Sequence, residues 1–171
     1  YGGFENNIIS GDAGNDDIYA GEGKNSINGG DGNDLIYSGF ENDTIYGGAG
    51  DDSISDGGGN NIINGDNGND SIYSSFGNDT IYGGTGDDSI SGGGNKIIYG
   101  GEGNDIINSG IGNDNISGDV GNDNIDAGEG NNSVNGGDGN DLINSGSEND
   151  IILGGAGDDT INSGLGNDSI N

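Results

Sequence analysis

The stretch Gly47-Gly48-Ala49-Gly50-Asp51-Asp52-Ser53-Ile54 returns with small changes as Gly83-Gly84-Thr85-Gly86-Asp87-Asp88-Ser89-Ile90. Both are copies of a nine-residue unit, G-G-x-G-N-D-x-I-x, and variants of this unit fill the whole chain. A fixed short period of this kind is the sequence signature of a solenoid, in which each repeat packs on its neighbours.

The eighth position of the unit carries a regularly spaced apolar residue. From Ile9 to Ile90 it recurs every nine residues, and after one step of eight residues it resumes at Ile98 and continues to Ile170. The short step falls in residues 91–94, where one loop residue is missing. We therefore predict a single array of 19 repeats over residues 1–171, which we interpret as a piece of a longer array.

The unit predicts a short strand followed by a turn. Three residues, x-I-x, suit a strand in which Ile points inward and its neighbours outward. The six residues G-G-x-G-N-D suit a tight turn, because Gly and Asn tolerate positive φ. One strand and one turn reverse the chain, so two units of 18 residues make a coil. Stacked coils then pair as parallel strands about 4.8 Å apart, and we expect an all-β solenoid of about nine coils.

The composition indicates that the chain does not stay folded unaided. Of 171 residues, 43 are Gly, 31 are Asp or Glu and 2 are Lys or Arg, which gives a formal charge of -29. Apolar residues make up only 26%. Low apolar content together with high net charge is typical of chains that cannot bury enough surface to fold.

The same composition excludes several classes of function. The chain has no Cys and no His, which removes disulfides, common zinc sites and the usual catalytic triads. With so few basic residues, nucleic acid is not an expected partner. No apolar run approaches the roughly 20 residues of a membrane span. A thin, filled roll offers no cleft, so we do not expect an enzyme.

The nonapeptide resembles the calcium-binding repeat G-G-x-G-x-D-x-U-x of the repeats-in-toxin (RTX) family, and the resemblance runs from Gly2 to Asn171. It implies a right-handed parallel β-roll with calcium ions between successive turns. It also implies that turn carbonyls and the sixth-position Asp hold each ion. The family resemblance further implies an extracellular bacterial protein, exported by a one-step (type I) secretion system.

Calcium also follows from the physical chemistry of the stack. Asp residues at the same repeat position would lie about 4.8 Å apart, where two charges repel by ~3.5 kcal/mol at an effective dielectric constant near 20. Ca²⁺ accepts six to eight carboxylate and carbonyl oxygens, whereas Mg²⁺ is geometrically stricter. We therefore expect a chain that is disordered without calcium and folds on binding it.

The two edges of the solenoid differ in charge. Numbering the repeats from the one that contains Ile9, we call the turns of even repeats the even edge and those of odd repeats the odd edge. Every sixth position of the even edge is Asp, and we expect a full calcium row there: Asp16, Asp34, Asp52, Asp70, Asp88, Asp105, Asp123, Asp141 and Asp159. The odd edge mixes Asn and Lys with five further candidate ligands, for which we expect a sparse or weaker row: Asp43, Asp79, Asp114, Asp150 and Asp168.

Lys96 occupies a sixth position and is the sharpest departure from the repeat. One hypothesis places its ammonium between Asp79 and Asp114, where it replaces a calcium charge. The alternative is that Lys96 points into solvent.

Several apolar residues are expected to face outward. Phe4, Phe40, Phe76 and Ile111 recur at the third position of every fourth repeat. They form either a contact stripe for a partner or the trace of a duplicated four-repeat block. Six of the seven Tyr follow the inward Ile directly and should also face outward. Lateral or end-to-end self-association, or contacts within a surface layer, are therefore candidate interactions.

Three functions fit these features. The first is an extracellular structural segment: an extender of a surface adhesin, a surface-layer component or a fibre. The second is a secretion and folding module of a toxin or hydrolase. The third is ice binding, which needs a regular Thr array, whereas Thr precedes the Ile only at residues 44, 80 and 160.

Overall fold

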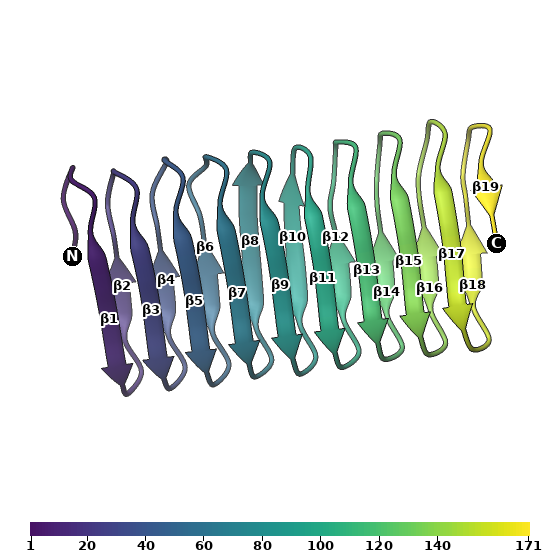
Figure 1. Ribbon diagram of the computed structural model, residues 1–171. Coiled ribbons are helices and arrows are strands. Elements are labelled where there is room, and N and C mark those ends of the chain that lie inside the picture. Colours follow the sequence, from purple (N-terminus) through teal and green to yellow (C-terminus); the bar gives the residue numbers. More distant parts are fainter.

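The computed structural model describes all 171 residues as two parallel β-sheets that face each other (Figure 1). The ten-stranded sheet contains β1 (Ile8–Ala13), β3 (Ser26–Asp31), β5 (Thr44–Ala49), β7 (Ile62–Asn67), β9 (Thr80–Thr85), β11 (Ile97–Glu102), β13 (Asn115–Val120), β15 (Ser133–Asp138), β17 (Ile151–Ala156) and β19 (Ser169–Ile170). The nine-stranded sheet contains β2 (Asp17–Tyr19), β4 (Leu35–Tyr37), β6 (Ser53–Ser55), β8 (Ser71–Phe76), β10 (Ser89–Gly93), β12 (Ile106–Asn108), β14 (Asn124–Asp126), β16 (Leu142–Asn144) and β18 (Thr160–Asn162). No helix that could cross a membrane is found.

Every strand pairs in parallel with the strand one coil further along the chain. Ile9 pairs with Ile27 in the larger sheet, and Ile18 pairs with Ile36 in the smaller one. Each coil is therefore 18 residues long, and the rod in Figure 1 advances by one odd and one even strand at a time. This confirms the right-handed parallel β-roll of about nine coils.

The expected strand length of three residues is confirmed for most even strands but is wrong for most odd ones. The odd strands run for six residues, through the first three positions of the next repeat. In β3, for example, Gly30 still pairs with Gly48 and Asp31 with Ala49. Gly30 has φ 116°, a conformation that Gly adopts at little cost. The chain can therefore begin to bend without leaving the ladder.

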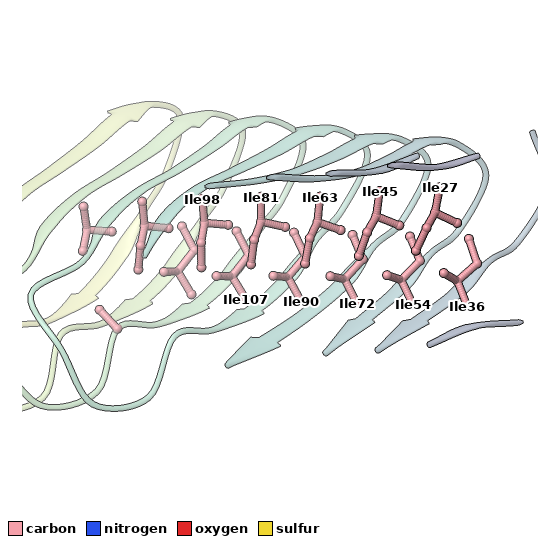
Figure 2. Packing of buried hydrophobic residues seen from close by; sticks show 14 of the residues in the cluster. Ile27, Ile36, Ile45, Ile54, Ile63, Ile72, Ile81, Ile90, Ile98 and Ile107 are labelled. Carbon is pink, nitrogen blue, oxygen red and sulfur yellow. The ribbon is translucent and has the colours of Figure 1, made fainter. Parts of the chain in front are cut away.

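Two facing rows of Ile form the core (Figure 2). The buried cluster contains 18 residues, and 16 of them are the Ile or Val of a repeat. The other two are Ala20 and Ala127, which lie at first positions of odd repeats. At the ends of the rod Ile9 and Ile161 are partly buried and Ile170 is 51% exposed, because only one neighbouring coil covers them.

The missing loop residue is absorbed within one coil. Between β8 and β10, Gly92 pairs with Ser74 and Gly93 with Phe76, so Ser75 has no partner in the ladder. Ile90 still pairs with Ile107 on the following coil. The deletion predicted near residues 91–94 is thus a local irregularity of the odd edge and leaves the core rows in line.

The outer faces carry the aromatic residues, as predicted. Tyr1, Tyr19 and Tyr37 stack in a column with ring centroids 5.1 and 5.0 Å apart, and Tyr82 stacks on Tyr99. The residues at the third position of every fourth repeat are exposed on the odd edge: Phe4, Phe40, Phe76 and Ile111. These apolar groups remain available for contacts outside the rod.

A pair of adjacent isoleucines tests the inward and outward assignment. Ile63 is fully buried, whereas Ile62 is 48% exposed on the outer face. We expect Ile63→Ala to lower the free energy of unfolding by about 2–5 kcal/mol, because it leaves a cavity in the core. The matched control Ile62→Ala should cost at most about 1 kcal/mol. Urea unfolding of the folded protein measures both, and equal losses would contradict this packing.

Candidate metal centre

The nine even-edge aspartates lie where each even-edge turn re-enters a strand, at the lower loops of Figure 1. The seven internal ones are 1–2% exposed, and Asp16 and Asp159 at the ends are partly exposed. Each of them is the sixth residue of its repeat, so it follows the glycine-rich turn and directly precedes the strand that carries the core Ile. The structure thus brings the predicted even-edge residues into one column.

From Asp34 onward, one oxygen of each carboxylate is bonded to the coil before it. The main-chain N–H of Asp16 donates to Oδ1 of Asp34 at 2.8 Å, and the N–H of Asp34 donates to Oδ1 of Asp52 at 2.8 Å. The same bond recurs at 2.8–3.0 Å through every later coil. This ladder fixes the orientation of each carboxylate.

The second oxygen of each carboxylate has no hydrogen-bond partner. Eight buried Oδ2 atoms share this property, one for each gap between two coils: those of Asp16, Asp34, Asp52, Asp70, Asp88, Asp105, Asp123 and Asp141. A buried polar atom without a partner costs free energy, and a buried charge costs more. Because the same unpaired atom recurs in eight successive coils, it is a regular property of the repeat rather than a local defect.

Glycine at the first position of the even repeats leaves room beside this oxygen. A Cβ added to Gly11 would come within 2.7 Å of Oδ2 of Asp16 and would also overlap the carbonyl oxygen of Gly29 on the next coil. All nine first positions of the even edge are Gly, and each would meet the Asp of its own repeat in this way. We call the space beside Oδ2 between two coils the cradle. It can therefore accept a small ligand but not a side chain.

Asparagines at the sixth position of the odd edge reveal which other atoms face the cradle. Nδ2 of Asn25 donates to the carbonyl of Gly23 at 2.9 Å and to the carbonyl of Ser38 at 3.2 Å. Nδ2 of Asn132 makes the equivalent bonds to Gly130 and Ser145. At the even edge the main chain also offers a carbonyl oxygen at each of these two repeat positions, the fourth of the same repeat and the first of the repeat one coil on. Where Asp replaces Asn, a carboxylate oxygen therefore faces carbonyl oxygens and no donor.

Burial raises the pKa of several even-edge carboxyls, and neighbouring aspartates add to the effect. The pKa of Asp88 is raised to about 7, and those of Asp52, Asp70 and Asp123 to about 6, in each case chiefly by burial and against the hydrogen bond from the preceding coil. The metal-free column thus resists carrying its full negative charge.

A hard divalent cation fits this donor set. Ca²⁺ combines carboxylate and carbonyl oxygens in flexible geometry, whereas Mg²⁺ demands a near-octahedral shell. No point of the structure brings three or more acidic side chains together. Main-chain carbonyls must therefore supply most of the ligands, with one aspartate oxygen such as Oδ2 of Asp34 supplying charge.

The odd-edge candidates occupy the equivalent column, and Oδ2 of Asp43, Asp114 and Asp150 is likewise buried without a hydrogen-bond partner. Asp43, Asp79, Asp114 and Asp150 are 1–3% exposed, and the terminal Asp168 is partly exposed. In each of their repeats a Ser stands at the first position, where the even edge has Gly. Sequence reasoning missed this difference, although comparing first positions separately for each edge would have shown it.

Lys96 points into the protein. Its side chain is 1% exposed, and Nζ lies 2.6 Å from Oδ2 of Asp79. The solvent-facing alternative is therefore wrong. The predicted contact with Asp79 is confirmed, whereas Asp114 receives the main-chain N–H of Lys96 rather than its ammonium.

Comparison with known families agrees with this geometry. The sequence model of the RTX calcium-binding nonapeptide repeat (four copies) matches residues 1–36, 37–72, 65–96, 91–116, 117–152 and 135–170. Together these matches cover nearly the entire chain. No curated protein matches the sequence.

The raised pKa values predict how the metal-free coil responds to pH. The pKa of Asp88 is about 7 in the coil against 3.8 for the ordinary group, so the folded state binds more protons. The stability of the metal-free coil is then greatest in acid and falls as the pH rises through about 6–7. In excess chelator we therefore expect more β-structure by circular dichroism at pH 5 than at pH 8. Higher metal-free stability at pH 8 would contradict the assignment.

Proposed function

The chain belongs to the family of RTX calcium-binding nonapeptide repeats, and from this premise we propose that it is an extracellular structural rod whose coils close on calcium along the even edge. The observation that carries the proposal is the row of eight unpaired Oδ2 atoms, one in each gap between coils. A cation in each gap gives every one of these oxygens a partner.

The residues that would hold each ion come from two successive coils. For the gap that follows Asp34, they are Oδ2 of Asp34, the carbonyl of Gly32 in the same turn and the carbonyl of Gly47 on the next coil. The equivalence with the asparagine contacts of the odd edge supports this set, as does the closeness of Asp34 and Gly47 to the position of a Cβ on Gly29. Calcium supplies the positive charge that the column of carboxylates lacks.

The low charge of each donor set supports a role outside the cell. Calcium affinity rises with the number of charged ligands and with the rigidity of the site, and extracellular modules bind with Kd of about 10⁻⁴–10⁻³ M. One carboxylate oxygen per gap places these sites at the weak end of that range. The chain would then remain unfolded at low calcium and fold where calcium is abundant.

Within this proposal the rod serves as a spacer in a surface adhesin, a surface layer or a fibre. The regular straight stack in Figure 1 supports a spacing role. The outward apolar side chains, such as Phe76 at 74% and Ile151 at 60% exposure, support lateral association. Coupling of folding to calcium equally suits a secretion module of a larger toxin or hydrolase, which is the second candidate.

Calcium titration tests the proposal directly. We expect the chelated chain at pH 8 to lack β-structure by circular dichroism, and calcium to restore it cooperatively because binding to the folded state alone drives folding. Magnesium at the same concentration should restore much less. Full β-structure in excess chelator at this pH would contradict the proposal.

A single substitution tests the ligand assignment. In Asp70→Asn the new amide can donate to the carbonyls of Gly68 and Gly83, as Asn25 does at the odd edge, so the fold should persist with one bound calcium fewer. The matched control is Asp51→Asn, which removes the same charge from an exposed site where Oδ1 accepts the main-chain N–H and the side-chain amide of Asn69. Equilibrium dialysis measures both. An unchanged count in Asp70→Asn would refute Asp70 as a ligand.

A further inference from the structure

Among the sixth-position aspartates that another coil follows, only Asp79 has a hydrogen-bond partner for its Oδ2. Eleven others keep a buried, unpaired Oδ2: Asp16, Asp34, Asp43, Asp52, Asp70, Asp88, Asp105, Asp114, Asp123, Asp141 and Asp150. Oδ2 of Asp79 accepts the hydroxyl of Ser74 at 2.5 Å and the ammonium of Lys96 at 2.6 Å. The gap between the coil of Asp79 and the coil of Lys96 is therefore built differently from the others.

The ammonium of Lys96 is held by oxygen atoms of two successive coils. Besides Asp79, its Nζ donates to the carbonyls of Ser75 at 2.7 Å and Gly77 at 3.2 Å, which belong to the same turn as Asp79. It also donates to the carbonyl of Gly93 in its own turn. One carboxylate oxygen and three carbonyl oxygens thus surround one positive charge. These are the ligand types that Ca²⁺ takes from a protein.

The carbonyl of Gly77 shows that the ammonium lies at the cation position of the other gaps. Gly77 is the fourth residue of its repeat, as Gly23 is in the repeat of Asn25, where Nδ2 donates to the Gly23 carbonyl. Oδ2 of the aspartate and the carbonyl of the fourth residue are also the ligands that we assign to calcium in the turn of Asp34. In the gap after Asp79 both of these oxygens accept from Lys96.

The repeat that contains Lys96 is adapted to its long side chain. Among the odd repeats that have a coil on each side, only this one begins with Gly. A Cβ on this residue, Gly92, would come within 2.9 Å of Cε of Lys96. The same repeat is the one that lacks a turn residue. The lysine, the glycine and the deletion coincide in one repeat, which indicates a single adaptation of the turn.

The lysine replaces one kind of bond between coils by another. On either side of it the usual ladder is intact, because Oδ1 of Asp79 accepts the N–H of Asn61 and Oδ1 of Asp114 accepts the N–H of Lys96, both at 2.7 Å. A lysine side chain has no acceptor, so it cannot receive the main-chain N–H of Asp79. The ammonium supplies three other bonds to the same coil, those to Ser75, Gly77 and Asp79.

From these contacts we infer that the ammonium of Lys96 is a resident cation that holds the gap after Asp79 in place of calcium. The inference rests on the proposed function, in which calcium fills the gaps whose Oδ2 is unpaired. The side chains of Lys96 and Asp79 are both fully buried, and like charges repel strongly in such surroundings. The ammonium therefore keeps Ca²⁺ out of this gap, and the junction holds its charge at every calcium concentration.

Lys96→Asn tests the inference, with Lys24→Asn as the matched control. Asn stands at the sixth position of other odd repeats, as in Asn25, so it suits the fold and restores an acceptor for the N–H of Asp79. Removal of the ammonium opens the gap, and equilibrium dialysis should find one more bound calcium per folded chain. Lys24 is exposed at a fifth position, where Asn is the commonest residue, so Lys24→Asn should leave the count unchanged.

The outcomes separate this inference from the proposed function. An unchanged count in folded Lys96→Asn overturns the inference alone, because calcium still binds in the other gaps. An unaltered chain that binds no calcium overturns the proposed function instead.

Anomalous scattering from crystals of the calcium-saturated, unaltered protein is a second measurement that needs no variant. We expect peaks in the even-edge gaps and none between Asp79 and Gly93. A calcium peak between these two residues contradicts the inference. Should Lys96→Asn fail to fold, this measurement still decides.

Discussion

Each coil of the rod places an aspartate carboxylate directly over that of the coil before it, with one oxygen bonded to the neighbouring main chain and the other facing only oxygens. At the spacing of parallel strands such charges repel by ~3.5 kcal/mol per pair at an effective dielectric constant near 20. The core opposes this repulsion with only one Ile or Val per repeat. We infer that the stack requires neutralisation of these carboxylates, by a cation between them or by protonation in acid.

The two edges solve the same problem in different ways. At the even edge Gly11 and its equivalents keep the cradle open, and every carboxylate retains an unpaired oxygen. At the odd edge Asn25 donates to main-chain carbonyls, and Oδ2 of Asp79 accepts from Ser74 and Lys96, whereas Oδ2 of Asp43, Asp114 and Asp150 has no hydrogen-bond partner.

Much of this architecture can be predicted from the sequence because the repeat leaves few alternatives. The nine-residue spacing of Ile fixes the coil, the two facing sheets and the even-edge column from Asp16 to Asp159. The six-residue strands could not be predicted, because they depend on how Gly30 and its equivalents bend while still pairing. The burial of Ala20 in the core was also missed, since a first-position residue reads as part of a turn. The serine at the first position beside the odd-edge aspartates, such as Ser38 in the repeat of Asp43, is recognised only when the first position is read separately for each edge.

A crystal structure of the calcium-saturated protein, with anomalous scattering used to locate the ions, is the most direct measurement. The account predicts an anomalous peak in each even-edge gap, bonded to an aspartate Oδ2 such as that of Asp34 and to carbonyls of the two adjoining coils. An intact β-roll from calcium-saturated solution with no peak in these gaps would contradict the central claim that cations balance the carboxylate column.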